Sequence, residues 1–317
     1  MQDIVKKISE AVRAGNKEAQ VILDKALKGR EIYEDVSPDY WFKERFLPNI
    51  IFIDEAGYTQ MCIDALKIVS TTAGTDFGSS RQRDFGQLWA DMTRGYLGEY
   101  AFKKFLEEKY SISCQLDHEI GRLEDYLPTD IHNVKKSGEP WRKPKLSIGV
   151  KAAKWNGIWF DIPGDQFNHS DIHVLVKVGT GRDHLFAFFK QLSVFKDKVL
   201  KRGEDLGCIS KETSAEMFNR LPDFSPVPAY ICGFVKKSAD YASISYQGKK
   251  GNKHYTIAGW CGPIKSGDLE KIKQKEKISG NIKFSGIGEF AHENGYLFNA
   301  GNLLWTKSDW EKLCSAI

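Results

Sequence analysis

The chain has 317 residues, of which 41% are hydrophobic and 28% are charged, and its formal net charge is +4. This length can bury a sizeable core, and this balance is typical of a folded globular protein and argues against a disordered one. A net charge of +4 gives little support for a polyanionic partner, so local clusters of Lys and Arg must provide it.

Membrane proteins and secreted disulfide-rich proteins are two classes that the sequence disfavours. No apolar run approaches the roughly 18–20 residues needed to span a bilayer, and the charged N-terminus has no signal-peptide core. The six cysteines occur without a Cys-x-x-Cys pair, which argues against a structural zinc site or a disulfide framework. We therefore expect a cytoplasmic protein.

Residues 1–80 predict a helical N-terminal subdomain. Apolar residues recur at helical spacing near the N-terminus, and a short apolar run occupies residues 49–53. Residues 71–80 are rich in Gly, Ser and Thr, so we expect a hinge or loop there.

Residues 82–109 predict the longest helix, with an acidic residue close to its apolar stripe. The apolar members of the stripe are Leu88, Met92, Phe102 and Leu106. Glu99 lies seven residues from both Met92 and Leu106, which places it on or beside the stripe. A buried charge is costly unless it has a partner or a metal. Glu99 either pairs with Lys103 at the stripe's edge or reaches into a site.

A strand predicted over residues 146–154 has the residues best suited to chemistry. Its apolar residues alternate with polar ones, which is the period of a strand buried on one face, and Lys151 projects from the opposite face beside Gly149. Upstream, Asp130 lies at the start of what would be the preceding strand. A carboxylate and a lysine on neighbouring strands suggest metal-assisted phosphodiester chemistry.

Further strands are predicted downstream. An Asn-Gly turn at residues 156–157 predicts that residues 158–162 pair back on the lysine strand as a hairpin. The other predicted strands are residues 171–178, 185–189, 230–235, 242–246, 255–260, 281–284 and 296–304. A closing helix would begin with Ser308 as its N-cap. Together these elements predict an α/β protein in which helices flank a central mixed sheet.

Basic residues flank the proposed site. Residues 135–144 predict a polar hairpin tip, with Trp141 and Trp155 interleaved among the basic residues of this region. The candidate DNA-binding residues are Lys135, Lys136, Arg142, Lys143, Lys145 and Lys154. This composition is expected of a groove that binds a DNA backbone, although an exposed, soluble hairpin would have it too. The pair His169 and His173 would lie about 13 Å apart on one strand, too far to share a metal ion.

Residues 95–178 resemble the PD-(D/E)XK nuclease superfamily, and within it the type II restriction endonucleases. The resemblance consists of Glu99 in Gly-Tyr-Leu-Gly-Glu, the segment Pro-Thr-Asp that ends at Asp130, and Ile-Gly-Val-Lys that ends at Lys151. It implies a restriction-endonuclease-like core in which Mg²⁺ is bound by Asp130, Glu99 and the backbone carbonyl of Val150. In that family the lysine positions the attacking water and the scissile phosphate, and Lys154 would be a secondary phosphate contact.

The sequence departs from the family at one position that matters. Gly149 stands where the family usually has Asp or Glu, and one residue is inserted within the proline-aspartate element. Three outcomes are open: Glu99 compensates, the site is inactive, or another carboxylate takes this position. The candidates for that carboxylate are Asp161, Asp171 and Glu139.

The sequence therefore predicts a magnesium-dependent, sequence-specific endonuclease for double-stranded DNA. We expect a homodimer, because cutting both strands of a symmetric site takes two copies related by a two-fold axis. Residues 81–220 would form the catalytic core, and residues 221–317 a β-rich extension for DNA recognition or dimerisation. The alternatives are a non-catalytic DNA-binding protein on a degenerate nuclease scaffold, a DNA repair nuclease, and a small-molecule enzyme with an unrelated α/β fold.

Overall fold

The computed structural model describes residues 26, 31, 38–72, 84–117, 129–155, 157–181, 183–237, 244–245 and 294–317. The α-helices in these ranges are α3 (Pro38–Tyr40), α4 (Glu55–Thr72), α5 (Phe85–Tyr110), α6 (Gly164–His169), α7 (His184–Gln191), α8 (Lys201–Asp205), α9 (Lys211–Arg220) and α11 (Lys307–Ala316). The π and 3₁₀ segments are η1 (Trp41–Phe46), η2 (Leu47–Asn49), η4 (Phe195–Leu200) and η5 (Ala300–Asn302). The strands are β1 (Ile50–Ile53), β2 (Ile112–Leu116), β3 (Ile131–Lys136), β4 (Ile148–Lys154), β5 (Trp159–Pro163), β6 (Ile172–Val178), β7 (Val227–Lys236), β8 (Ile244–Ser245) and β9 (Asn294–Asn299).

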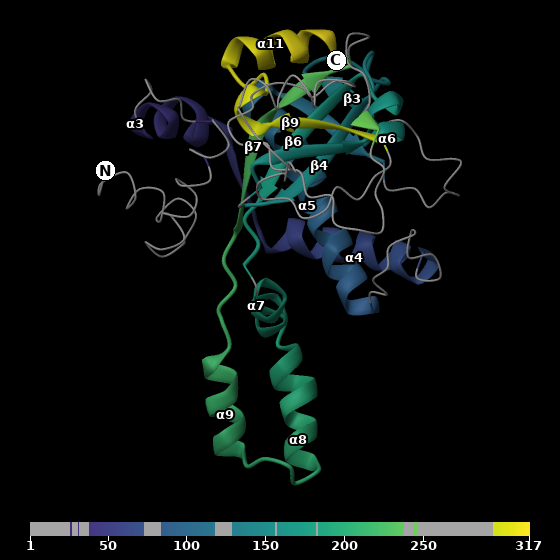
Figure 1. The fold of residues 1–317 in the computed structure, drawn as a ribbon. Helices are drawn as coiled ribbons and strands as arrows, with labels where there is room; N and C mark the ends of the chain where they lie inside the picture. The colour runs from purple at the N-terminus through teal and green to yellow at the C-terminus, as the bar shows by residue number, and fades with distance from the viewer. Residues whose placement is uncertain are drawn as a thin grey trace.

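A four-stranded mixed sheet lies at the centre of the protein (Figure 1). Its strand order is β1-β7-β6-β4; β7 is antiparallel to β1 and β6, whereas β4 and β6 are parallel. The predicted α/β class, with a central mixed sheet flanked by helices, is confirmed. The three predicted segments, residues 1–80, 81–220 and 221–317, all contribute strands to this one sheet. They also share its core.

Two apolar clusters cover the two faces of the sheet. The first cluster joins the sheet to α4 and α5, and its strand residues include Ile148, Val174 and Ile231. The second cluster joins the other face to η1, β5 and β9, and it includes Leu175. Because side chains alternate along a strand, β6 contributes to both clusters and is buried along its whole length. Lys151 alternates with first-cluster residues, so it belongs to the face opposite α5.

Helix α5 confirms the helix predicted over residues 82–109. Asp84 caps its first turn by accepting a hydrogen bond from the backbone N–H of Gln87 at 2.8 Å. The helix ends at Ser111, whose φ of 54° is left-handed. In its middle, a Cβ added at Gly98 would lie 2.7 Å from Cβ of Ala152 on β4. Glycine therefore allows α5 to approach β4 closely.

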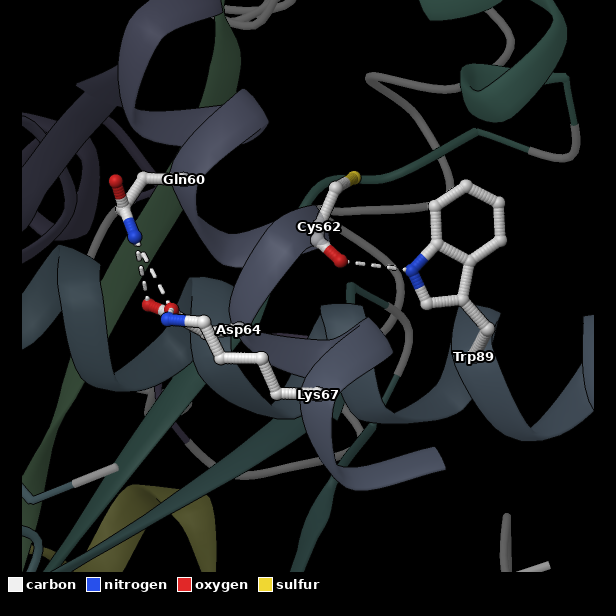
Figure 2. Close-up of polar contacts among 5 residues, drawn as sticks. All are labelled: Gln60, Cys62, Asp64, Lys67 and Trp89. Atoms are coloured by element: carbon white, nitrogen blue, oxygen red, sulfur yellow. Dashed lines mark hydrogen bonds and ion pairs between the residues drawn. The ribbon is translucent and has the colours of Figure 1, made fainter. Parts of the chain in front are cut away.

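Polar contacts from α4 hold the two helices that back the sheet (Figure 2). The indole Nε1 of Trp89 on α5 donates to the backbone carbonyl of Cys62 on α4 at 2.9 Å. On α4 itself, the buried carboxylate of Asp64 accepts from Gln60 at 3.1 Å and from Lys67 at 2.8 Å. A buried carboxylate with hydrogen-bond donors is tolerated, because the contacts replace part of its lost hydration.

Three predictions about single elements were wrong. Residues 185–189 form helix α7 and not a strand, since a short apolar run has no periodicity that separates the two. Strand β5 pairs with β9 and not with the lysine strand, although the turn before it is present. The last helix is capped by Thr306, two residues before Ser308. The predicted strands at residues 255–260 and 281–284 lie outside the described residues, as do most of residues 1–37 and 73–83.

An arm of helices projects from the body below α7 and consists of η4, α8 and α9 (Figure 1). Its large apolar side chains are not all covered, and those of Val199, Leu206 and Met217 are more than 45% exposed. Across the described ranges, no helix combines the length and the apolar character that crossing a bilayer requires.

Candidate active site at the open edge of the sheet

Strand β4 is an edge strand, and Asp130 is bound to its open side. The four-stranded sheet ends at β4, which pairs with β6 on one side only. On the other side, the backbone N–H of Asp130 donates to the carbonyl of Ile148 at 2.8 Å. The carboxylate Oδ2 of Asp130 accepts from the backbone N–H of Val150 at 2.5 Å. The sequence-predicted aspartate and lysine are therefore brought together, one residue apart along the edge of β4.

Lys151 is half-buried and has a neutral hydrogen-bond partner. Its Nζ donates to the amide Oε1 of Gln166, on α6, at 2.8 Å. Burial lowers the pKa of Lys151 from its ordinary value, while the nearby charges of Asp161 and Asp130 act in the opposite sense. A lysine held by an amide, with two carboxylates near it, keeps a proton that is easier to remove than that of an exposed lysine. Gln166 was missed in the sequence, because a glutamine on a six-residue helix has no recognisable signal there.

Packing explains the glycine at position 149. A Cβ built there would lie 3.1 Å from both Nδ1 of His173 and Oγ of Ser170. His173 is buried and stacked on the Phe167 ring with 5.0 Å between centroids, and its Nε2 lies 3.1 Å from the Phe167 carbonyl. Burial is the main reason why the pKa of His173 is lowered, so this ring is neutral at pH 7. A side chain at position 149 would therefore fit only if the His173 ring or the Ser170 hydroxyl moved by a few tenths of an ångström.

The three carboxylates considered as replacements lie in different surroundings. Asp171 accepts hydrogen bonds from the backbone N–H and the hydroxyl of Ser147, at 2.9 and 2.8 Å, and these bonds lower the pKa of Asp171. Glu139 is exposed on the hairpin, 3.8 Å from Arg142. Asp161 is the one whose charge acts on Lys151. Its carboxylate Oδ1 is buried.

Glu99 lies on the helix that crosses the other face of β4. It follows Gly98, whose backbone packs on Ala152. Lys103, at position i+4 from Glu99, has its Nζ 4.0 Å from a carboxylate oxygen of Glu107. Helix α5 covers the face of the sheet opposite to Lys151, so a path from Glu99 to the side of Lys151 would run around the open edge of β4. A metal-binding role for Glu99 stays a prediction, and the described residues contain no group of three or more His, Cys, Asp or Glu placed to hold a metal.

The basic residues differ in how far they are exposed. Lys135, Lys143, Lys145 and Lys154 are exposed, whereas Lys136 and Arg142 are partly buried. The guanidinium of Arg142 donates to the carbonyl of Ile317 at 2.5 Å, which ties the hairpin to the end of the chain. Trp141 is 44% exposed, but Trp155 packs edge-on against Phe46 at 6.0 Å in the second cluster. Arg142 and Trp155 thus have structural contacts that the sequence did not predict.

The oxygen donors at this edge fit a hard divalent cation. The carbonyl and N–H of one strand residue point the same way, so the carbonyl of Val150 faces the open side together with Asp130. Carboxylates and a backbone carbonyl are the ligands that Mg²⁺ prefers, and Mg²⁺ usually needs only one or two carboxylates because it keeps several waters. The donor set at the β4 edge therefore suits Mg²⁺ better than a softer metal such as zinc.

The arrangement as a whole brings together an oxygen-rich edge, an amine with a lowered pKa, and exposed lysines on the neighbouring hairpin and at the end of β4. Such a set can bind a cation and a phosphate side by side. The chain matches no family model, no curated protein and no solved structure. What the protein does must therefore be inferred from this site.

Proposed function

We propose that this protein is a Mg²⁺-dependent endonuclease that cleaves double-stranded DNA at specific sequences, in the manner of the type II restriction endonucleases that residues 95–178 resemble. One observation supports this most: the carboxylate of Asp130 accepts the N–H of Val150, which holds an acid one residue from Lys151. The spacing of twenty residues in the sequence thus corresponds to direct contact between two neighbouring segments.

In this proposal Asp130 and the carbonyl of Val150 hold the cation, with Glu99 reaching it around the edge of β4. Bound Mg²⁺ neutralises charge that develops on the phosphate and makes its water more acidic. Lys151 positions the attacking water and the scissile phosphate, and Gln166 fixes the direction of its ammonium group. Lys154 contacts a neighbouring phosphate. Two of these roles are supported by hydrogen bonds of β4: the N–H of Val150 donates to Asp130, and Lys151 donates to Gln166.

A homodimer completes the proposal, because two copies of the site are needed to cut both strands of a symmetric sequence. The projecting arm supports it. A partner subunit would cover the exposed apolar residues of the arm. Acidic and basic residues are mixed along the same helices, and Lys201 forms an ion pair with Asp205 at 2.9 Å. Replacing Val199, Leu206 and Met217 by serine is expected to convert a dimer into a monomer in analytical ultracentrifugation. A wild-type protein that sediments as a monomer with DNA bound would contradict the homodimer.

A non-catalytic DNA-binding protein is the second candidate, and Gly149 favours it. The position that usually supplies a metal ligand has no side chain, and His173 and Ser170 fill the space beside it. A scaffold of this kind would keep its basic surface and bind DNA with a strong salt dependence while lacking hydrolysis.

The test is incubation of the purified protein with mixed-sequence plasmid and phage DNA, in Mg²⁺ or in EDTA. Discrete fragments in Mg²⁺ alone are expected. A smear would indicate a repair or degradative nuclease, which has no sequence preference. Salt-dependent DNA binding without cleavage would favour the binding protein, and a protein that neither cleaves nor binds DNA would overturn both.

A further inference from the structure

The site at the β4 edge lacks one of the carboxylates usual for its family, and a neighbouring strand carries a candidate. We propose that Asp161, on β5, is the second carboxylate ligand of the divalent cation, in the place left open by Gly149. This inference rests on the proposed function. It makes β5, an element outside the matched motif, part of the catalytic centre.

The first argument is that the usual position is closed. A side chain at position 149 meets His173 Nδ1 and Ser170 Oγ at its first carbon, at 3.1 Å each. His173 cannot move aside freely, since it is stacked on Phe167 and hydrogen-bonded to the carbonyl of the same residue. A second acidic ligand must therefore come from another part of the chain.

The second argument is the path of the chain after Lys151. A tight turn, in which the N–H of Gly157 donates to the carbonyl of Lys154 at 2.8 Å, returns the chain from β4 into β5. Strand β5 is held by antiparallel pairing with β9, with Asp161 opposite Leu297. Phe160 and Ile162 pack into the second cluster, which places β5 over the face of the sheet from which Lys151 projects. Asp161 alternates with these two residues, so its carboxylate lies outside the apolar cluster.

The third argument is that the carboxylate of Asp161 is buried and lies near the ammonium group of Lys151. Its Oδ1 is buried, although a carboxylate would ordinarily face water. Both Asp161 and Asp130 lie close enough to Lys151 for their charges to favour its ammonium form. The two carboxylates thus share one lysine, as expected when a cation, a phosphate and an ammonium group are to be held together.

The other acids fit less well. Asp171 is held by two hydrogen bonds from Ser147, and Glu139 is exposed beside Arg142 on the hairpin. On the Lys151 side of β4, Asp130, Asp161 and the carbonyl of Val150 give the cation two anionic oxygens and a neutral one. Glu99, from the other side, and waters complete its coordination. This is a set for Mg²⁺ or Mn²⁺.

The inference is tested with Mn²⁺ alone as the probe, by following the electron paramagnetic resonance signal of free Mn²⁺ during titration of the full-length protein. Asp161→Asn is expected to weaken Mn²⁺ binding by at least about tenfold, by analogy with the loss seen when groups around a metal are removed. Glu139→Gln and Asp171→Asn are the matched controls, and both are expected to bind Mn²⁺ as the wild type does. Wild-type Mn²⁺ affinity in Asp161→Asn would overturn the inference, as would a tenfold loss in either control alone.

A second measurement needs no variant and so remains informative if Asp161→Asn does not fold. Fe²⁺ with ascorbate and peroxide cleaves a polypeptide next to a bound iron, and the wild-type chain is expected to be cut near residues 130 and 161. Cuts near residue 130 without cuts near residue 161 would overturn the role of Asp161. The proposed function has a separate test: it fails if the wild type binds no Mn²⁺ and leaves DNA intact. If Asp161→Asn cleaves DNA at the wild-type rate, only the role of Asp161 is contradicted, and the proposed nuclease function stands.

Discussion

Lys151 and Lys177 lie on neighbouring parallel strands and on the same face of the sheet, yet their surroundings differ completely. Lys177 is 3% exposed, and its ammonium is 3.0 Å from the buried carboxylate of Glu31 and 5.9 Å from the Tyr230 ring. Lys151 is half-buried and donates to the amide of Gln166. The attraction of Glu31 keeps the pKa of Lys177 raised despite burial, whereas burial lowers that of Lys151.

The difference separates a structural lysine from one suited to chemistry. A lysine neutralised by a buried carboxylate has its charge satisfied, and it contributes to the specificity of packing. A lysine whose hydrogen bond goes to a neutral amide is not tied into an ion pair by direct contact, so a phosphate can still bind its charge, and its lowered pKa makes proton transfer easier. Under the proposed function, the same residue type on the same face has two roles, which depend on its hydrogen-bond partner.

The largest effect is expected from Lys151→Met. Loss of the ammonium should reduce the rate of Mg²⁺-dependent DNA cleavage by about 10²–10⁴-fold, the range typical of a positioned acid–base group or electrostatic stabiliser. The free energy of unfolding, measured in urea, should fall by less than in Lys177→Met, because the hydrogen-bond partner left behind is a neutral amide and not a buried carboxylate. A variant that cleaves normally but unfolds more easily would reverse the assignment of the two lysines.

The opposite pattern is expected from Lys177→Met. Removing the ammonium leaves the carboxylate of Glu31 buried without its ion-pair partner, which should lower the free energy of unfolding by about 3–5 kcal/mol. Urea denaturation measures this loss. The double variant Glu31→Gln with Lys177→Met should recover much of the stability, because no uncompensated charge remains. A single variant as stable as the wild type would show that the ion pair contributes nothing to the fold.

His184 is another partly buried basic side chain, and it makes the stability of the protein depend on pH. His184 is hydrogen-bonded to the buried hydroxyl of Tyr58, and burial lowers the pKa of His184 to about 4. The unfolded chain therefore binds a proton between about pH 6.5 and 4 that the folded protein does not. This contribution to stability is present above pH 6.5 and is lost as the pH falls toward 4.

The His184→Gln variant measures that contribution. Between pH 7 and pH 4.5 the free energy of unfolding of the wild type should fall by about 2–3 kcal/mol more than that of the variant. Urea denaturation at the two pH values gives both numbers. Equal losses in the two proteins would mean that His184 titrates normally.

The smallest effect is expected from Gln166→Glu, which gives Lys151 an anionic partner like that of Lys177. The carboxylate should raise the pKa of Lys151. If the charged ammonium positions the phosphate, cleavage is lost as the pH rises through this pKa. The alkaline limb of the pH–rate profile, where the rate falls, should therefore move to higher pH by about one pH unit. A limb that stays in place, or moves to lower pH, would exclude the ammonium of Lys151 as its origin.

Local pattern was enough for part of the fold and site. Alternation predicted the strands that hold Lys151 and Lys177. The sequence also predicted that Asp130 lies near Lys151, although β3 pairs with β2 and not with β4, and the proximity comes from the hydrogen bonds of Asp130 to the open side of β4. Contacts between distant segments had no local signal. Glu31 lies 146 residues from Lys177 in the sequence, and the pairing of β5 with β9 decides where Asp161 lies.

The central claim is that the acid bound to the edge of β4 holds the metal used in DNA cleavage, and Asp130→Asn tests it most directly. An asparagine oxygen can still accept the N–H of Val150, so the variant should fold and bind DNA as the wild type does. Single-turnover cleavage in Mg²⁺ should be at least about 100-fold slower, as when one essential electrostatic group is removed. Cleavage at the wild-type rate would contradict the account.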